Sequence, residues 1–331
     1  MPKQFEKSLL EAIEAQLPEN LSLAKELESR LGVTRSAVYK KIRGEASFSV
    51  AEMLQLARSF GISLDRLAFE AGGNQLFQYS NGNPEPQSPE EYLGRIQVQL
   101  MELLSEGNPQ MWHITNDLPF FWYFFFPEIC SFKLLIWSYI SRGVQGDAQD
   151  FEPQRFAEQY PQLDAIRSEI AKLYIQVPTT EIWPAQFAEH MLIQIHKTLE
   201  AHVISVDAAR VLLDKMQELL NLIAQVANTG IKQTPDGAQG ASVQLYLNEL
   251  ILSGEMIFIE NESGTTVHLP LDIPNFLSSS QTGFNVHVRQ YMDAVVNAST
   301  RISKDGELQR QRVLNMARKR LQFFREEMRL T

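Results

Sequence analysis

The sequence predicts a mainly α-helical protein whose second domain contains one small antiparallel β-sheet. Three observations lead to this fold class. Apolar residues recur at helical spacing through most of the chain, Gly and Pro cluster within residues 71–87, and strand-like alternation is confined to about 243–269. A length of 331 residues suits about two domains. We therefore expect a domain over residues 1–70, a linker over 71–87 and a larger helical domain over 88–331.

Residues 1–70 are expected to form five short helices, because each apolar stripe has a start or a stop signal. These signals are Pro18 after the first helix, Asn20 and Gly32 around the second, Thr34 and Gly44 around the third, the Ser49–Glu52 capping box of the fourth, and Ser63 before a fifth that reaches Ala68. Such closely spaced caps predict a compact helical bundle.

The larger domain is expected to contain mostly helices. Ser88 and Pro89 begin the first, which extends to Leu104, and the others are expected at about 119–126, 128–142, 153–176, 184–202, 206–228, 283–298 and 306–328. Residues 228–242 are expected to be a loop. Alternation at 243–247, followed by strand-like segments at 255–260 and 265–269, predicts the small sheet and its hairpin.

Composition excludes several classes of protein. Apolar residues make up 44% and charged residues 21% of the chain, so it is neither disordered nor fibrous. The single cysteine, Cys130, cannot form an internal disulfide and suits a reducing compartment. The N-terminus lacks the apolar core of a signal peptide, and the longest apolar run, Leu118–Phe126, is too short to span a bilayer. We expect a cytoplasmic protein with no membrane partner.

No motif for catalysis or cofactor binding is found. The sequence has no Walker loop, no Gly-x-Ser-x-Gly and no Gly-x-Gly-x-x-Gly. His190, His196 and His202 are six residues apart, which turns successive imidazoles about 120° away from one another on a helix, so they cannot share a metal ion. We expect no enzyme, no cofactor and no metal site.

The distribution of charge points to a nucleic-acid partner despite the net charge of −10. Residues 1–70 are neutral overall, but residues 30–43 carry five basic and no acidic side chains. On the third helix Val38 and Ile42 face inward, whereas Arg35, Tyr39 and Arg43 share the opposite side with Ser36 and Lys40. A basic helix face of this kind can contact DNA phosphates and base edges.

The segment SLAKELESRLGVTRSAVYKKIRGEASFSVAEMLQLARSFGISLDRL resembles the helix-turn-helix of the Xre/Cro, lambda-repressor-like transcriptional regulators. The resemblance lies in the turn Leu31–Thr34, the sequence Arg43-Gly44-Glu45 after the third helix, and the fourth helix closed by Gly61–Leu64. It departs at Glu28, where the family usually has a small residue. It implies a five-helix DNA-binding domain whose third helix lies in the major groove of double-stranded DNA. The segment Tyr39–Glu45 also resembles a sub-group of bacterial regulators with a long C-terminal domain.

The resemblance makes six residues candidates for DNA contact. Arg35 and Ser36 lie at the N-terminal end of the recognition helix, which approaches base edges. The full set is Thr34, Arg35, Ser36, Tyr39, Lys40 and Arg43. Two alternatives remain: the basic residues form only a solvated face, or the helix-turn-helix is a docking module in a protein–protein adaptor.

An aromatic segment at residues 111–137 holds ten of the 32 aromatic residues of the chain. We favour its interpretation as a central core helix. The alternative is an apolar pocket for a small-molecule effector, lined by Trp112, Trp122, Tyr123 and Trp137.

A homodimer is expected, because one recognition helix reads too few bases for a useful site. The helix at 306–328 is one candidate for the contact. It carries a coiled-coil-like stripe of Leu314, Ala317, Leu321, Phe324 and Met328, and residues 308–331 are strongly basic. The alternative is that this stripe packs within its own domain.

Overall fold

The computed structural model describes residues 2–18, 21–64, 67, 77–79, 86–142, 151–250, 254–272 and 275–328. By its internal contacts the chain separates into an N-terminal unit, residues 1–77, and a C-terminal unit, residues 78–331. The fifth helix predicted from Ser63 to Ala68 and most of the linker predicted at 71–87 lie largely outside the described residues.

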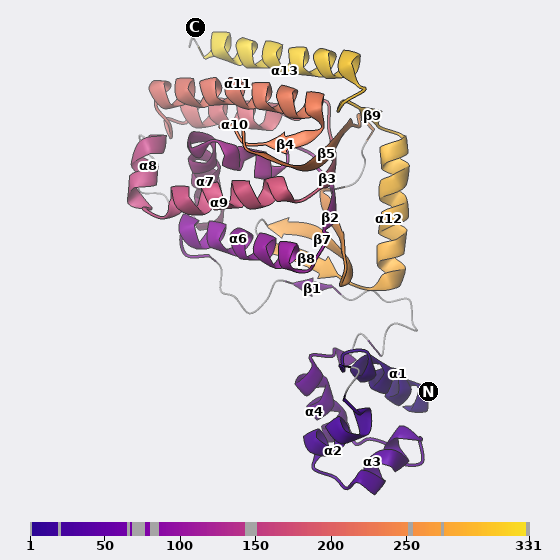
Figure 1. Cartoon of the computed structure of the whole chain (residues 1–331). Helices are drawn as coiled ribbons and strands as arrows, with labels where there is room; N and C mark the ends of the chain where they lie inside the picture. Colours follow the sequence, from indigo (N-terminus) through magenta and orange to yellow (C-terminus); the bar gives the residue numbers. More distant parts are fainter. Residues whose placement is uncertain are drawn as a thin grey trace. The chain divides into compact units, whose positions relative to one another are not determined.

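The N-terminal unit is helical, as predicted. Its described helices are α1 (Pro2–Glu14), α2 (Leu23–Leu31), α3 (Arg35–Ile42) and α4 (Val50–Phe60) (Figure 1). Two predicted N-caps are confirmed: the Thr34 hydroxyl accepts a hydrogen bond from the Ala37 amide, and Ser49 and Glu52 form a reciprocal capping box. The N-cap of α2 is Ser22, whereas the predicted Asn20 lies outside the described residues. Each helix contributes buried apolar side chains to one small core, which includes Leu9, Ile13, Leu27, Val38 and Leu56.

The C-terminal unit contains a nine-stranded mixed sheet in its described residues, so the prediction of a helical domain with one small antiparallel sheet is wrong. The strand order is β1-β8-β7-β6-β2-β3-β5-β4, and β9 pairs with β5. The strands are β1 (Gln78–Tyr79), β2 (Gln110–Ile114), β3 (Thr179–Trp183), β4 (Ile231–Gln233), β5 (Gln239–Leu247), β6 (Met256–Asn261), β7 (Gly264–Asp272), β8 (Asn275–Ser279) and β9 (Thr300–Arg301). The pairs β2–β3 and β3–β5 are parallel, and the others are antiparallel.

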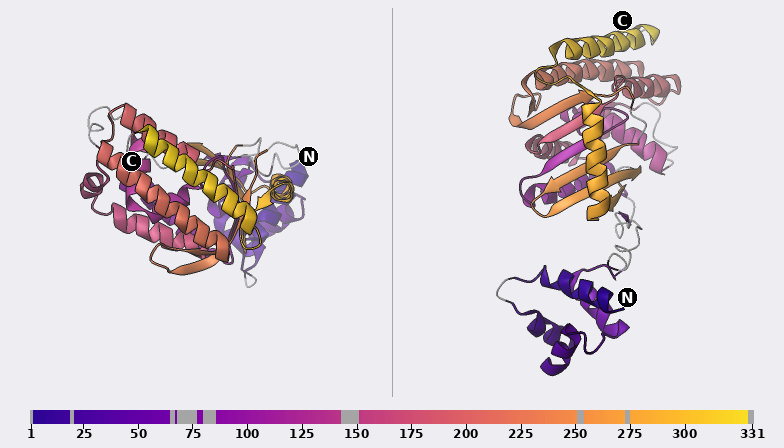
Figure 2. Two further views of the ribbon diagram at one scale, coloured as in Figure 1. Left: turned by 90° about the horizontal axis from the view of Figure 1, so that it is seen from above. Right: turned by 90° about the vertical axis from the view of Figure 1, so that its right-hand side faces the viewer.

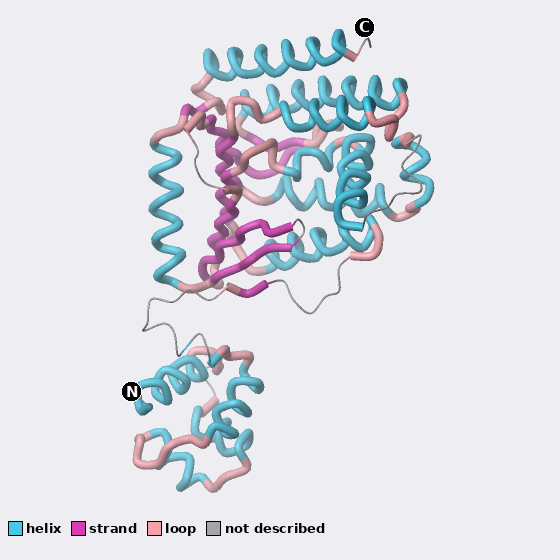
Figure 3. Tube along the Cα trace, turned by 180° about the vertical axis from the view of Figure 1, so that it is seen from behind, coloured by secondary structure: helices cyan, strands magenta, loops and turns pink. Residues whose placement is uncertain are grey.

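Helices cover the two faces of this sheet unequally. They are α6 (Pro89–Ser105), the 3-10 helix η1 (Phe120–Phe125), α7 (Pro127–Arg142), α8 (Pro153–Gln159), α9 (Leu163–Gln176), α10 (Glu189–Glu200), α11 (Val206–Thr229), α12 (Thr282–Asn297) and α13 (Glu307–Glu327). Figures 1 and 3 show α12 on one side of the strands and α6, α7, α9, α10 and α11 on the other. Figure 2 shows α12 crossing in front of the strands. No helix in the described part of the chain is long and apolar enough to cross a membrane.

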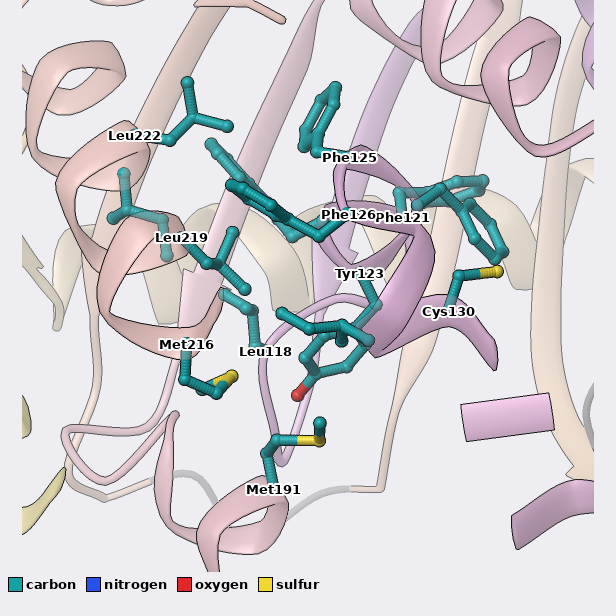
Figure 4. Close-up of a cluster of buried hydrophobic side chains, with 14 of the residues drawn as sticks. Leu118, Phe121, Tyr123, Phe125, Phe126, Cys130, Met191, Met216, Leu219 and Leu222 are labelled. Atoms are coloured by element: carbon teal, nitrogen blue, oxygen red, sulfur yellow. The ribbon is translucent and has the colours of Figure 1, made fainter. Parts of the chain in front are cut away.

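Two separate apolar cores follow from this arrangement, because successive strand residues point to opposite faces. Ile114, Ile182 and Phe258 pack under Val288 and Met292 of α12. The larger core lies on the opposite face, and η1 is at its centre. Figure 4 shows side chains of η1, α10 and α11 gathered into this cluster. Cys130 is fully buried there, as expected of a small core residue.

The missed strands are short and lie between helices. The strands β2 and β3 have five residues each, and four of the five β3 residues are buried, so neither strand shows the alternation that marks a half-exposed strand. The residues predicted as a loop at 228–242 contain β4 and the start of β5. The antiparallel hairpin β6–β7, predicted at 255–269, is confirmed.

Two predicted helices also differ in detail. Residues 153–176 form α8 and α9 rather than one helix, because Pro161 cannot continue the hydrogen-bond ladder of α8. Residues 119–126 form the 3-10 helix η1 rather than an α-helix.

The apolar stripe of α13 packs inside its own unit and is therefore not free to be a dimer seam. Leu314, Leu321 and Phe324 are all buried within the single chain. The basic side of the helix also pairs with the acidic body of the same unit: Arg320 Nε donates to Glu189 at 2.9 Å, and Arg325 to Asp214 at 2.5 Å. The intramolecular alternative for this stripe is the one observed.

Candidate nucleic-acid interface and effector pocket

Helices α2 and α3 are joined by a tight turn at Gly32. This residue has φ +66°, the left-handed conformation that glycine adopts without strain, and its amide donates to the Glu28 carbonyl at 3.0 Å. The N-cap Thr34 follows two residues later, and α3 begins at Arg35. The half-buried Glu28 is accommodated in α2, so its departure from the family pattern does not disrupt the turn.

The two faces of α3 differ sharply in exposure. Val38 is 1% exposed and packs in the core, and Ala37 and Ile42 are half-buried. The opposite side is exposed along the whole helix. It carries all six residues proposed for DNA contact, namely Thr34, Arg35, Ser36, Tyr39, Lys40 and Arg43. The chain therefore presents hydroxyl, phenol and basic groups together on one accessible surface, which we call the α3 face.

The basic residues near α3 are not equivalent. Lys41 turns away from the α3 face, because its ammonium donates to Glu52 at 2.9 Å and to the Ser47 carbonyl at 2.7 Å. Arg43 forms an exposed ion pair with Glu45 at 3.1 Å, which water and salt weaken. The Arg35 guanidinium lies 5.8 Å from the ring centroid of Tyr39. Lys40 is exposed, so its ammonium is accessible to an anion.

This geometry defines a helix-turn-helix domain. Residues 16–67 match the family model for the helix-turn-helix, an Xre/Cro-like DNA-binding type of domain. Comparisons with curated proteins and with solved structures found no match. The family match covers the N-terminal unit alone.

The four residues proposed for an effector pocket do not come together. Tyr123 and Trp137 line a cavity of about 230 Å³ beside η1 and α7, which we call the η1 pocket. Trp122 is 1% exposed and donates its indole N–H to buried Glu181 at 2.9 Å, so it belongs to the core. Trp112 lies on the opposite face of the sheet, where the Arg289 guanidinium is 3.7 Å from its ring centroid.

The η1 pocket also contains Asp117, Lys133 and Glu255, which were not among the predicted pocket residues. The Tyr123 hydroxyl donates to Asp117 at 3.3 Å, and the Lys133 ammonium is 3.8 Å from the same carboxylate. Burial raises the pKa of Asp117 and lowers the pKa of Lys133, because each charge is partly removed from water. Glu255 also lines the pocket, and its carboxylate lies 2.7 Å from Nε2 of the buried His113.

Strand topology explains why these residues meet. Asp117 follows the carboxyl end of β2, and Glu255 immediately precedes β6, whose Met256 pairs with Ile114 of β2. A sequence signal exists for Asp117, because polar residues after a buried strand cluster at the strand ends of α/β sheets. That signal was missed because no strand was predicted at residues 110–114. Among the described residues, no three His, Cys, Asp or Glu side chains are grouped as metal ligands would be.

Proposed function

We propose that the protein is a sequence-specific, DNA-binding transcriptional regulator in which α3 enters the major groove. The observation that carries this proposal is the α3 face, where six polar and basic residues are exposed while the reverse side of the same helix packs in the core. Arg35 and Ser36 are in the first turn of α3, the end that meets base edges in this type of domain. Tyr39, Lys40 and Arg43 lie further along and suit phosphate contacts.

The proposal separates two kinds of contact that can be measured independently. Arg35→Ala should relax discrimination at one operator position by about 1–3 kcal/mol, because a bidentate arginine–guanine contact is lost. Lys40→Ala should weaken specific and random DNA alike and reduce the salt dependence of binding, because it removes one phosphate contact. Fluorescence anisotropy at several salt concentrations measures both effects.

A matched control is Arg58→Ala, which removes an exposed basic residue from α4 rather than from α3. It should leave both the affinity and the operator preference nearly unchanged. An equal loss on specific and random DNA for Arg35→Ala would contradict base readout by α3. DNA affinity that does not change with salt would favour the adaptor alternative, in which the domain docks on a protein.

We also propose that the regulator acts as a homodimer and that the C-terminal unit supplies the contacts and senses an effector. The recognition helix has only eight residues, so two copies on adjacent half-sites are needed for a useful operator. The apolar side chains of the described N-terminal helices are largely used in their own core. In the C-terminal unit, the outer side of α13 keeps Leu308, Met316 and Phe323 exposed, which supports an interface there.

A further inference from the structure

The η1 pocket lies where α/β sheets commonly bind ligands. It is at the carboxyl end of β2, next to the point at which the parallel pair β2–β3 gives way to the antiparallel pair β2–β6. Its volume of about 230 Å³ is below the range of roughly 300–1,000 Å³ that holds drug-sized molecules. A ligand for this pocket must therefore be small.

One side of the η1 pocket is apolar and aromatic. Tyr92 of α6 and Trp137 of α7 form a ring pair with centroids 4.6 Å apart. Phe120, Phe124, Leu134 and Ile136 complete this wall. Because Ile136 and Trp137 are only half-buried, the wall reaches the surface of the unit and a ligand has a route in. The wall suits a hydrocarbon or aromatic body.

The other side of the η1 pocket carries an excess of negative charge. Asp117 and Glu255 contribute two carboxylates, Lys133 contributes one ammonium, and histidine is neutral in the formal count at pH 7. The net formal charge is −1. One carboxylate oxygen of Asp117, Oδ1, is buried and has no hydrogen-bond partner among the described residues. The Asp117 and Glu255 side chains are each 23% exposed, so a ligand donor can reach the accessible part of both carboxylates.

The pocket already holds one ammonium in the way a ligand ammonium would be held. The Lys133 Nζ atom lies 4.5 Å from the ring centroid of Tyr123 and 3.8 Å from the Asp117 carboxylate. Aromatic faces combined with a carboxylate are a general arrangement for binding organic ammonium ions. Glu255, together with Tyr92 and Trp137, offers the same combination without a lysine of its own.

We propose that the η1 pocket binds a small organic amine, with its ammonium at Glu255 and Asp117 and its apolar or aromatic body against Tyr92 and Trp137. Binding of the amine is independent of the N-terminal unit. The amine's role as an effector rests on the proposed function, because it requires that the protein bind DNA.

Binding can be tested on the full chain with probes that share a body and differ in charge. Phenethylamine, tryptamine and cyclohexylmethylamine are the amine probes, 2-phenylethanol is the neutral analogue and 3-phenylpropanoate is the anionic one. Titration calorimetry should show at least one amine binding about tenfold or more tightly than the alcohol, because a charge-assisted hydrogen bond is gained. Absence of binding by all three amines, or tighter binding of the carboxylate, would overturn the proposal.

Two variants tie the binding to this pocket. Glu255→Gln keeps a hydrogen-bonding group for His113 but removes the charge, and it should weaken the best amine about tenfold. Ile136→Trp fills the pocket from its half-buried rim and should abolish binding. Glu102→Gln is the matched control, because this exposed carboxylate of α6 lines a different cavity and its loss should have no effect.

Each outcome of the variant series is decisive once far-ultraviolet circular dichroism has shown the variants to be folded. Amine binding that survives both Glu255→Gln and Ile136→Trp would place the site elsewhere and overturn the proposal. The amine is then added to the protein–DNA complex as a separate measurement. DNA affinity that does not respond to a bound amine would refute only the effector role, whereas a lack of DNA binding would refute the proposed function and leave the amine site standing.

Discussion

The buried carboxylate of Glu181 allows a quantitative test of how the C-terminal unit is stabilised. Glu181 is 1% exposed and lies on β3 between η1 and α9. Trp122 Nε1 donates to it at 2.9 Å, Trp183 Nε1 at 3.1 Å and the Thr179 hydroxyl at 2.8 Å, and the Tyr174 hydroxyl is a fourth donor. Burial, and then the charge of Glu181, raise the pKa of Tyr174, so its phenol remains a donor at neutral pH.

We expect Trp122→Phe to lower the free energy of unfolding of this unit by about 2.5–4 kcal/mol. About 1.5–3 kcal/mol comes from the lost hydrogen bond to a buried charge, and about 1 kcal/mol comes from the smaller ring. The control is Trp137→Phe, which changes a half-buried tryptophan that lines the η1 pocket and is not among the donors to Glu181. It should cost less than about 1 kcal/mol.

Urea unfolding followed by tryptophan fluorescence measures this difference. All four tryptophans lie in residues 78–331, so the signal reports on the C-terminal unit alone, and three reporters remain in each variant. Equal destabilisation by Trp122→Phe and Trp137→Phe would contradict a stabilising hydrogen bond from the Trp122 indole to Glu181. It would mean that the indole donor contributes nothing to holding the buried carboxylate.

Three further predictions concern other parts of the chain. Burial lowers the pKa of Lys232 to about 7, so between pH 7 and 8.5 the unfolded chain binds more protons than the folded one, and the free energy of unfolding rises with pH. Urea unfolding of Lys232→Met should show a smaller rise over this range. The same pH dependence in Lys232→Met and the unsubstituted chain would contradict a neutral Lys232 in the folded state. Gly32→Ala should destabilise the N-terminal unit by about 1–2 kcal/mol, because its φ of +66° strains any residue with a Cβ, and hydrogen exchange of the α2 and α3 amides should accelerate. Light scattering of the full chain should give the mass of a dimer, and a monomer at micromolar concentration would be inconsistent with the proposed two-fold binding.

The N-terminal unit was predictable because its structure is dictated by local signals. Thr34 and the Ser49–Glu52 box cap α3 and α4, as the sequence predicts, and Gly32 ends α2 in the left-handed conformation. The face of α3 that the helical wheel assigned to solvent is the exposed one. Short helices with a cap at nearly every end leave few alternatives.

The sheet of the C-terminal unit was not predictable from periodicity, because its central strands are covered on both faces. The strand β3 occupies only Thr179–Trp183 and lies between Pro178 and Pro184, which break the flanking helices. Its partners β2 and β5 are about 65 residues away in either direction, so no local pattern reveals the pairing. Local signals marked only the alternation at 243–247, which lies in β5, and the hairpin β6–β7 with its turn of two residues.

The lining of the η1 pocket was only partly predictable, because the strand pairing that completes it leaves no local pattern in the sequence. An aromatic segment pointed to Tyr123 and Trp137, but the carboxylates of Asp117 and Glu255 are brought beside them by the pairing of β2 with β6 across 142 residues of chain. Trp112 and Trp122 lie on different sides of the sheet, because the Trp112 side chain on β2 points to the face covered by α12, whereas η1, which carries Trp122, packs on the other face.

Selection of genomic DNA fragments by the purified full chain directly tests whether α3 reads a specific DNA sequence. We expect enrichment of one sequence motif with two half-sites about one DNA turn apart. Repeating the selection with Arg35→Ala should relax the preference at a single position in each half-site, while Arg58→Ala should return the original motif. Fragments recovered in the proportions of the input, or a motif that is unchanged by Arg35→Ala, would contradict base readout by α3.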